Sequence, residues 1–294
     1  MKSKGTLFAL LSGICSGLAP LFSKIAMGAG LTPFTLLFAR VFFSAVILLF
    51  VVKSRGPIAK LTAIQLRAVL FVSAAFTATL GSLIYSYTLI PSGVAMTFHF
   101  GYPIFVVLLA FIFFRQKPTS MQIVCIFLAL TGVVLMQNTA GGLHPVGVAT
   151  ATFSGISYAT YLLTINKSSL SQLEPLQLNL YIHWFCTLFV LLAWPLQGKV
   201  PLSTSLVGWG AALGGAVVVS VLAMTLLQSS LRLISAQTAS ILTTLEPVTS
   251  VLVGVFIFQE NLSLKSVIGL VLVLGSVVIL STAKERPAGA LSNK

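Results

Sequence analysis

Three charged side chains lie inside long apolar stretches of this 294-residue chain, and Glu246 is the acid among them. Glu246 lies near the middle of the run from Ala236 to Phe258, and a charged acid at the centre of a bilayer costs roughly 3 kcal/mol on insertion scales. Such a carboxyl group can bind a substrate amine or take up and release a proton. It can also form a structural ion pair with Lys24 or Arg40, or stay protonated and bond a neighbouring helix. Function is favoured, because ionisable groups inside a membrane are functional by default.

Arg40 and Lys24 are the two bases inside apolar runs. Arg40 lies about 10 Å along a helix from the start of its run, so its side chain can reach the interface by snorkelling. The alternative, to which we give equal weight, is that its planar guanidinium group binds a substrate carboxylate through two hydrogen bonds. Lys24 is shallower, and snorkelling is favoured for it. Arg40 and Glu246 in one cavity would suit a zwitterion, whereas recovery of transport after the two charges are swapped would indicate a structural pair.

Aromatic and histidine side chains within the apolar runs are weaker candidates for a substrate pocket: Tyr85, His99, Tyr102, Tyr158, His183 and Trp184. His99 and Tyr102 lie three residues apart and therefore share one face of a helix. Tyr85 and Tyr158 lie at comparable depths in other runs. The alternative for all of them is structural, since a Tyr in a membrane helix commonly bonds a neighbouring backbone.

Prolines inside the runs are candidate helix breaks: Pro20, Pro103 and Pro247. A proline removes one backbone donor and frees a carbonyl one turn earlier. Paired breaks at the midplane are typical of transporter binding sites. The alternative is a tolerated kink that affects packing alone.

Enzymatic patterns are missing from the sequence. The chain has no Asp, no acid pair within one run, no histidine pair at metal spacing and no glycine-rich phosphate loop. Cys15, Cys125 and Cys186 each lie in an apolar run and have no metal-ligand spacing. We therefore expect neither an enzyme nor a bound cofactor or metal.

The composition identifies the surroundings of these residues as lipid. The chain is 57% hydrophobic and 7% charged, whereas soluble domains carry about a quarter charged residues. Each apolar run must be a helix, because the bilayer core offers the backbone no other partner and the alternation of a barrel strand is absent. The sequence predicts ten membrane-spanning helices, at Thr6–Met27, Pro33–Val52, Ala68–Leu89, Ser92–Phe114, Ser120–Met136, Val146–Ile165, Leu178–Leu196, Leu206–Gln228, Ala236–Phe258 and Ser266–Thr282.

The positive charge predicts the orientation of these helices. The formal net charge is +13, from 17 Lys and Arg against four acids. With the N-terminus inside, 13 of the 17 bases fall in cytoplasmic segments, so the positive-inside rule predicts both termini in the cytoplasm. The basic balance is then explained without a nucleic-acid partner.

Two halves of the chain repeat each other. The segment from Ile90 aligns without a gap on the segment from Ile234 at a spacing of 144 residues, which pairs Pro103 with Pro247 and Tyr102 with Glu246. The front halves pair at a spacing of 142. Each unit holds an odd number of crossings, five, so the second unit is inverted in the membrane. Inverted repeats are the architecture of many secondary transporters.

The sequence resembles the drug/metabolite transporter superfamily, specifically the EamA-type transporters with ten helices. The resemblance covers nearly the whole chain. It is carried by SGICSGLAPLFSKIA with Gly17 and Lys24, by the Arg40 helix, and by LEPVTSVLVGVFIFQENLSLKSVIGLVLVLGS with Glu246, Pro247, Glu260 and Gly269. The first repeat departs from the pattern, since Tyr102, Gln116 and Cys125 stand at the positions of Glu, an acid and Gly.

The resemblance implies a carrier of small metabolites, with amino acids, nucleotide-like compounds, polyamines and drugs among the family's substrates. We expect two repeats, 1–140 and 141–283, followed by a cytoplasmic tail, 284–294. The expected function is secondary transport by alternating access, preferably export of an amino-acid-like compound across the bacterial inner membrane, with the proton as candidate coupling ion. The alternatives are an uptake carrier for a cationic or nucleoside-like metabolite and, more distantly, a channel or a lipid-acting membrane protein.

Overall fold

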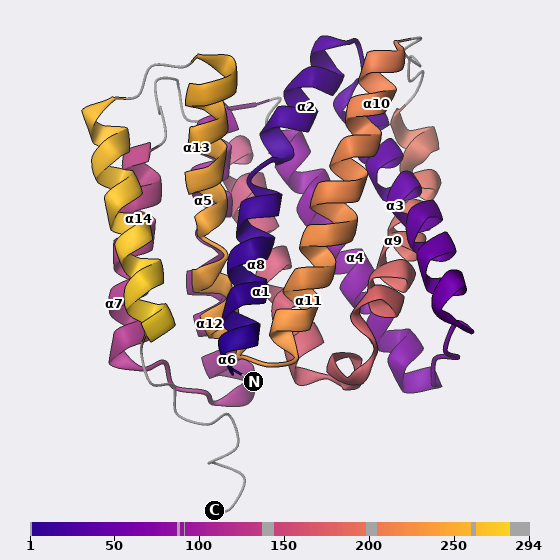
Figure 1. The fold of residues 1–294 in the computed structure, drawn as a ribbon, viewed down its shortest axis with the longest axis horizontal. Helices are drawn as coiled ribbons and strands as arrows, with labels where there is room; N and C mark the ends of the chain where they lie inside the picture. The colour runs from indigo at the N-terminus through magenta and orange to yellow at the C-terminus, as the bar shows by residue number, and fades with distance from the viewer. Residues whose placement is uncertain are drawn as a thin grey trace, which may run out of the picture.

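The computed structural model describes residues 2–86, 89–90, 92–136, 144–197, 205–259 and 263–282. Helices and the turns between them make up this part of the chain (Figure 1). The first repeat contains α1 (Lys2–Ser16), α2 (Ala19–Gly28), α3 (Pro33–Arg55), α4 (Ala63–Ser86), α5 (Ser92–His99), α6 (Tyr102–Phe114) and α7 (Ser120–Met136). The second contains α8 (Pro145–Lys167), η1 (Ser169–Gln172), α9 (Pro175–Ala193), η2 (Trp194–Gln197), α10 (Leu206–Gly215), the π-helix η3 (Ala216–Ala223), α11 (Met224–Leu231), α12 (Ala236–Leu242), α13 (Leu245–Phe258) and α14 (Leu264–Thr282).

These elements join into ten rods, which we number span 1 to span 10. Spans 1, 4, 8 and 9 are composite, namely α1–α2, α5–α6, α10–η3–α11 and α12–α13; spans 2, 3, 5, 6, 7 and 10 are α3, α4, α7, α8, α9 and α14. Seven rods are long and apolar enough to cross a bilayer as described, and three shorter apolar helices belong to spans 4, 5 and 10. The predicted ten-helix membrane fold is thereby confirmed.

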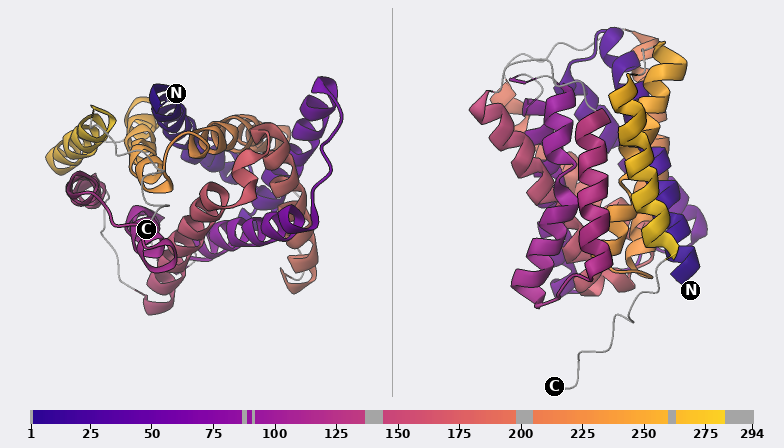
Figure 2. Two further views of the ribbon diagram at one scale, coloured as in Figure 1. Left: turned by 90° about the horizontal axis from the view of Figure 1, so that it is seen from below. Right: turned by 90° about the vertical axis from the view of Figure 1, so that its left-hand side faces the viewer.

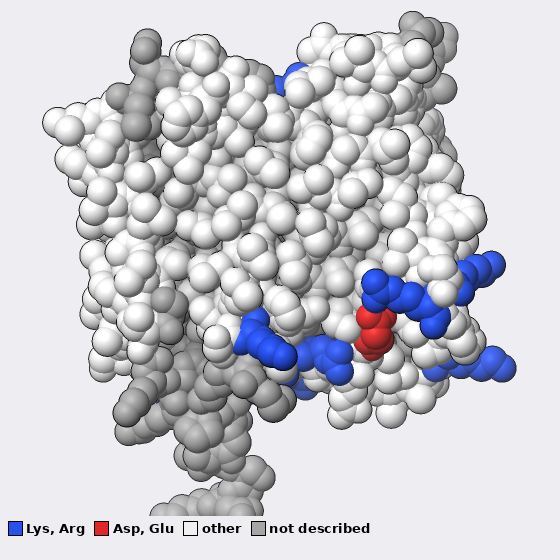
Figure 3. Space-filling model, viewed as in Figure 1, with Lys and Arg blue, Asp and Glu red and all other residues white. Residues whose placement is uncertain are grey.

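The outer surface of the bundle is apolar, as a lipid-facing surface must be. Large side chains such as Phe50, Phe113, Phe127 and Phe256 are more than two thirds exposed. On the face drawn in Figure 3, most charged side chains gather near the end that bears the N-terminus, and the band above them is largely uncharged. Exposure of this surface to water would be unfavourable, because burial of apolar surface stabilises a protein by about 25 cal/mol per Å².

The packing of the spans repeats with the sequence. Spans 3 and 6 pack along their lengths, and their repeat mates, spans 8 and 1, do the same through α10–α2, α1–η3 and α1–α11. Span 5 packs on its own mate, span 10, at one edge of the bundle, as the end-on view in Figure 2 shows, and span 2 packs on its mate, span 7. A bundle in which every main contact has a counterpart in the other half is the expected product of two inverted repeats.

Three spans are interrupted partway along their lengths. Span 1 breaks at Gly17–Leu18, span 4 at Phe100–Gly101 and span 9 at Thr243–Thr244. Each break lies two to four residues before one of the prolines singled out above, whose missing N–H and ring disfavour a continuous helix. Span 6 is continuous although it is the mate of span 1, and Leu162 stands at the position that corresponds to Pro20.

Candidate functional site

The breaks of spans 4 and 9 meet at the centre of the bundle. The hydroxyl of Tyr102, in the first turn of α6, lies 2.8 Å from the hydroxyl of Thr243, in the break of span 9. Tyr102 is the repeat mate of Glu246, and Thr243 is the mate of His99. The contact therefore joins corresponding parts of the two repeats across their symmetry.

Two glycines allow spans 1 and 6 to approach these breaks closely. A Cβ atom on Gly13 would lie 3.2 Å from the carbonyl oxygen of Thr243, and one on its mate Gly155 would lie 3.0 Å from the carbonyl oxygen of His99. The hydroxyl of Ser250 donates to the carbonyl of Gly17, in the break of span 1, at 3.1 Å. The three broken spans and span 6 thus enclose one centre.

Glu246 lies in the first turn of α13, about 15 Å along the axis of span 9 from Ala236. Its side chain is partly buried. Among the described residues, its carboxylate interacts electrostatically with the Arg40 guanidinium, and no hydrogen bond reaches it. The charge also acts on Tyr102 and Tyr158. The acid therefore belongs to the centre, where the Arg40 guanidinium is its charged partner among the described residues.

Arg40 projects from α3 toward the π-helix of span 8. Its Nε atom donates to the hydroxyl of Ser220 at 3.2 Å, and its side chain is partly buried. One turn further along α3, the Ser44 hydroxyl donates to the Arg40 carbonyl at 2.6 Å and lies 3.4 Å from the Ala216 carbonyl. Asn179 of α9 donates to the carbonyls of Ser220 and Val221 at 3.0 and 3.3 Å. Spans 2, 7 and 8 therefore hold the guanidinium where its charge reaches Glu246.

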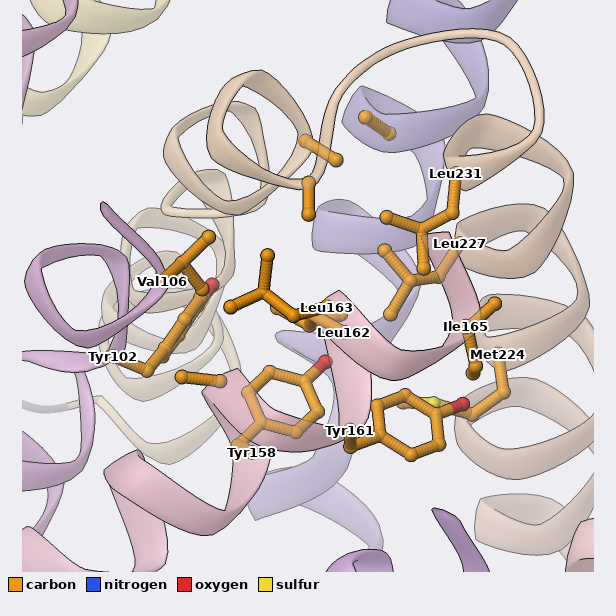
Figure 4. Close-up of a cluster of buried hydrophobic side chains, with 14 of the residues drawn as sticks. Tyr102, Val106, Tyr158, Tyr161, Leu162, Leu163, Ile165, Met224, Leu227 and Leu231 are labelled. Atoms are coloured by element: carbon orange, nitrogen blue, oxygen red, sulfur yellow. The ribbon is translucent and has the colours of Figure 1, made fainter. Parts of the chain in front are cut away.

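Tyrosines and one histidine form a continuous aromatic cluster beside these charges. The ring of Tyr158 meets that of Tyr102 edge-on at 4.9 Å and is parallel to that of Tyr161 at 5.7 Å. Figure 4 shows Tyr158 and Tyr161 side by side on α8, with Tyr102 approaching from α6. His99 lies 5.7 Å from Tyr158, and its Nδ1 is 2.8 Å from the hydroxyl of Ser154. The cluster extends the centre from Glu246 toward spans 3, 6 and 7.

Three of the sequence-predicted residues lie away from this centre. Trp184 is 52% exposed and shares the outer face of α9 with Leu188 and Leu191. Tyr85, near the end of α4, is also 52% exposed. Lys24 is exposed on α2. From the sequence, its side chain is expected to snorkel to the membrane interface. The structure thus brings together Glu246, Arg40, Tyr102, Tyr158 and His99, while Tyr85, Trp184 and Lys24 lie outside the group.

A polar ring that was not predicted from the sequence lies next to the aromatic cluster. Gln228 Nε2 lies 3.2 Å from the Tyr161 hydroxyl and 3.5 Å from Asn179 Oδ1. Asn179 accepts at its backbone oxygen from His183 Nδ1 at 3.0 Å. The Phe76 ring closes the circle by contacting Tyr161 at 5.0 Å and His183 at 6.0 Å. Asn179 and Gln228 stand at the ends of apolar runs, where a polar residue usually marks the boundary of a span, so the sequence carried little signal for them.

The described part of the chain holds no group of three or more His, Cys, Asp or Glu side chains that could bind a metal ion. Glu260, which the resemblance also pointed to, lies outside the described residues, as does the tail 284–294. The centre is therefore built from one acid, one base, neutral polar groups and aromatic rings. Ten spans in two inverted repeats, with corresponding breaks in spans 4 and 9 that meet at the centre, define a membrane transporter.

The chain belongs to the EamA-like transporter family. The family model matches residues 3–137 and again residues 145–282, which fits the drug/metabolite transporter superfamily that the sequence resembles. A protein of Synechocystis named as an uncharacterized transporter is 30% identical over 215 residues, which cover 69% of this chain and 63% of that protein. One from Archaeoglobus fulgidus with a similar name is 31% identical over 196 residues, which cover 65% of this chain and 68% of that one. The match to the Synechocystis relative thus spans less than two thirds of its length.

The fold also has a counterpart among solved structures. One crystal structure superposes with a TM-score of 0.85 and covers 96% of this chain and 99% of the other. The two sequences are 14% identical. The likeness extends to the whole bundle and concerns the fold alone.

Proposed function

We propose that this transporter is a secondary carrier that moves a zwitterionic, amino-acid-like metabolite by alternating access, with export as its physiological direction. The observation that carries the proposal is the pairing of Arg40 and Glu246 at the centre of the bundle. The two opposite charges interact, and the carboxylate receives no hydrogen bond from any described residue. An ammonium group fits beside Glu246, and a carboxylate fits the planar fork of Arg40.

Glu246 is stabilised by a ligand on energetic grounds. An isolated carboxylate away from water is costly unless it is paired or hydrogen-bonded. A substrate ammonium, or a proton when substrate is absent, offsets that cost. Exchange of one for the other couples transport to the proton gradient. One elementary charge that crosses 100 mV supplies about 2.3 kcal/mol, a bias of roughly fiftyfold.

The proposed setting is the cytoplasmic membrane of a bacterium, with the N- and C-termini in the cytoplasm. Among the residues that the structure describes, basic side chains cluster at the helix ends on the side of the N-terminus. They include Lys53 and Arg55 of α3, Lys167 of α8 and Arg232 after α11. Positive loops favour the cytoplasmic side. The expected repeats, 1–140 and 141–283, then alternate in opening the centre to either side.

The proposal is tested by counterflow in proteoliposomes loaded with a pooled panel of amino acids and other metabolites, read by mass spectrometry under an imposed pH gradient. We expect saturable exchange of a few amino acids. Glu246→Gln should abolish the response to the pH gradient and lower the exchange rate at least tenfold. Glu174→Gln is the matched control, because Glu174 caps α9 at an exposed position outside the bundle centre.

A second arm of the same experiment tests Arg40. Arg40→Lys keeps the charge but loses the fork, so it should raise KM for amino acids and leave exchange of the corresponding decarboxylated amines unchanged. Saturable exchange of cationic or nucleoside-like compounds in place of amino acids would favour the uptake carrier. Flux without saturation would favour a channel. Full activity of both variants would make the two charges structural.

A further inference from the structure

The polar ring beside the centre contains two hydrogen-bond acceptors that have no donor. The ring is formed by Phe76 of span 3, Tyr161 of span 6, Asn179 and His183 of span 7, and Gln228 of span 8, joined by the contacts given above. His183 and Gln228 are each 1% exposed. Among the described residues, His183 Nε2 and Gln228 Oε1 are buried without a hydrogen-bond partner.

The chemistry of the two atoms follows from their neighbours. His183 Nδ1 faces the Asn179 carbonyl at 3.0 Å, and a carbonyl accepts only, so Nδ1 carries the hydrogen and Nε2 presents a lone pair. Gln228 uses its amide nitrogen toward Tyr161 and Asn179, which leaves its oxygen as the second acceptor. Buried polar groups are nearly always hydrogen-bonded. Two orphan acceptors on residues that both contact Asn179 therefore call for a donor.

The surroundings select the kind of donor. Arg40 and Asn179 both contact Ser220, Arg40 at its hydroxyl and Asn179 at its carbonyl, and the Arg40 charge acts on His183. A neutral donor is therefore favoured over a cation at this ring. The rings of Phe76 and Tyr161, which pack on each other at 5.0 Å, flank His183 and Gln228, and a flat donor packs well along such rings. A neutral, planar donor meets both conditions: a carboxamide, an indole N–H or a phenol.

We propose that His183 and Gln228 form a side-chain subsite that accepts hydrogen bonds from a neutral donor at the end of the substrate side chain. This inference rests on the proposed function, since the charged groups of the same amino acid would lie at Arg40 and Glu246. The aromatic cluster connects the two places, because Tyr158 is parallel to Tyr161 and interacts with Glu246. The subsite thereby assigns a substrate class: amino acids such as glutamine, tryptophan or tyrosine, over purely aliphatic ones.

The first test needs only the wild-type carrier in proteoliposomes. It compares substrates of matched shape that differ in the donor: glutamine with methionine, and tryptophan with its benzothienyl analogue, in which sulfur replaces the indole N–H. We expect the donor-bearing member of each pair to have a kcat/KM about tenfold to a hundredfold higher, because its partner leaves buried acceptors unpaired. Equal values for both members would mean that the ring holds water and would overturn the inference.

The second test uses Gln228→Met and His183→Phe, with Gln237→Met as the matched control. Gln237 is another buried glutamine with an unpartnered side-chain atom, but it lies on α12 outside the ring. The two ring variants should reduce the preference within each pair to below about threefold while transport of methionine continues; the control should keep the wild-type preference. A preference that survives both ring variants would place donor recognition elsewhere and refute the subsite alone. Absence of any amino-acid exchange in the wild type would instead refute the proposed function on which it rests.

Discussion

Tyr102 and Glu246 occupy the same position in the two repeats, yet one is a neutral phenol and the other an acid. The difference breaks the symmetry of the centre. The phenol is engaged with Thr243 across the repeat interface, whereas the acid has no hydrogen bond from the described residues. One repeat thus contributes a contact across the repeat interface, and the other contributes the acid that we propose binds the substrate.

The contact between Tyr102 and Thr243 should stabilise the fold modestly. Tyr102→Phe removes the phenolic oxygen and Thr243→Val removes its partner, which also bonds the Ala239 carbonyl at 3.0 Å. Hydrogen bonds between membrane helices average about 0.6 kcal/mol and reach about 1.7 kcal/mol. A double-mutant cycle on thermal unfolding in detergent should give a coupling in that range. A coupling near zero would show that the two hydroxyls do not bond in the native protein.

Residue types alone pointed to the charged and aromatic members of the centre but not to its two amides. Glu246, Arg40 and the prolines are conspicuous because charge and helix-breaking residues are costly in an apolar run. Asn179 and Gln228 are not, since one neutral polar residue per run is common, and their meaning comes from the contacts between spans. Likewise, the sequence of a helix that is apolar on all sides does not show which face points toward the lipid. Trp184 and Tyr85 could therefore not be assigned to the exposed faces on which they lie.

Among the elements, the break of span 1 is held against span 9 by a glycine. A Cβ atom on Gly17 would lie 2.4 Å from Thr249 Cβ and 2.6 Å from the Glu246 carbonyl oxygen. Gly17→Ala must therefore push the two spans apart, and we expect a loss of about 2 kcal/mol in stability together with a loss of exchange. Gly81→Ala, on α4 with no atom within 4 Å of the added Cβ, should be neutral or stabilising by up to about 1 kcal/mol. Equal behaviour of the two variants in thermal unfolding and counterflow would contradict this packing.

The π-helix η3 is the element that the sequence did not reveal. No proline or charge marks Ala216–Ala223, and a π-helix differs from an α-helix only in which carbonyl each N–H reaches. Its carbonyls are instead met by side chains of other spans: Ser12 donates to Ala223 at 2.8 Å, and Asn179 donates to Ser220 and Val221. Tertiary contacts therefore support this geometry, and they come from helices that are far away in sequence.

Removal of Asn179 should accordingly affect both stability and function. Asn179→Leu leaves two carbonyls of η3 without their side-chain donor and loosens the segment that holds Arg40, so we expect a loss of about 2 kcal/mol and a raised KM for amino acids. Asn166→Leu is the matched control, because Asn166 donates to the carbonyl of Leu231, at the end of α11, and to that of Ile234, in the turn that follows. It should lower the unfolding temperature without changing KM. An unchanged KM in Asn179→Leu would separate η3 from substrate binding.

At the scale of the whole molecule, the repeat determines which contacts can change during transport. In a carrier with inverted repeats, each half adopts the conformation of the other when access switches. Contacts between a span and its own mate, such as spans 5 and 10, map onto themselves and can persist. The contact between spans 1 and 9 corresponds to the contact between spans 6 and 4, which is a different pair of helices. When access switches, the two contacts can therefore exchange their geometries.

Cross-links between the spans test this directly, in a protein whose Cys15, Cys125 and Cys186 are replaced by serine. Gly13→Cys with Leu245→Cys joins spans 1 and 9 at their breaks, where the Cβ of residue 13 would lie 3.3 Å from that of Leu245. We expect the oxidised protein to lose counterflow and to regain it on reduction.

Gly132→Cys with Val273→Cys is the matched cross-link, because it joins spans 5 and 10 where the Cβ of residue 132 would lie 2.7 Å from a Val273 methyl group. This pair packs at the edge of the bundle (Figure 2) and maps onto itself, so exchange should continue after oxidation. If both cross-linked proteins keep full exchange, the breaks do not move relative to each other, and alternation must come from side-chain gates within a static bundle. If the edge cross-link alone blocks exchange, the moving unit is the pair of spans 5 and 10, and the division of the bundle into exchanging repeats is wrong.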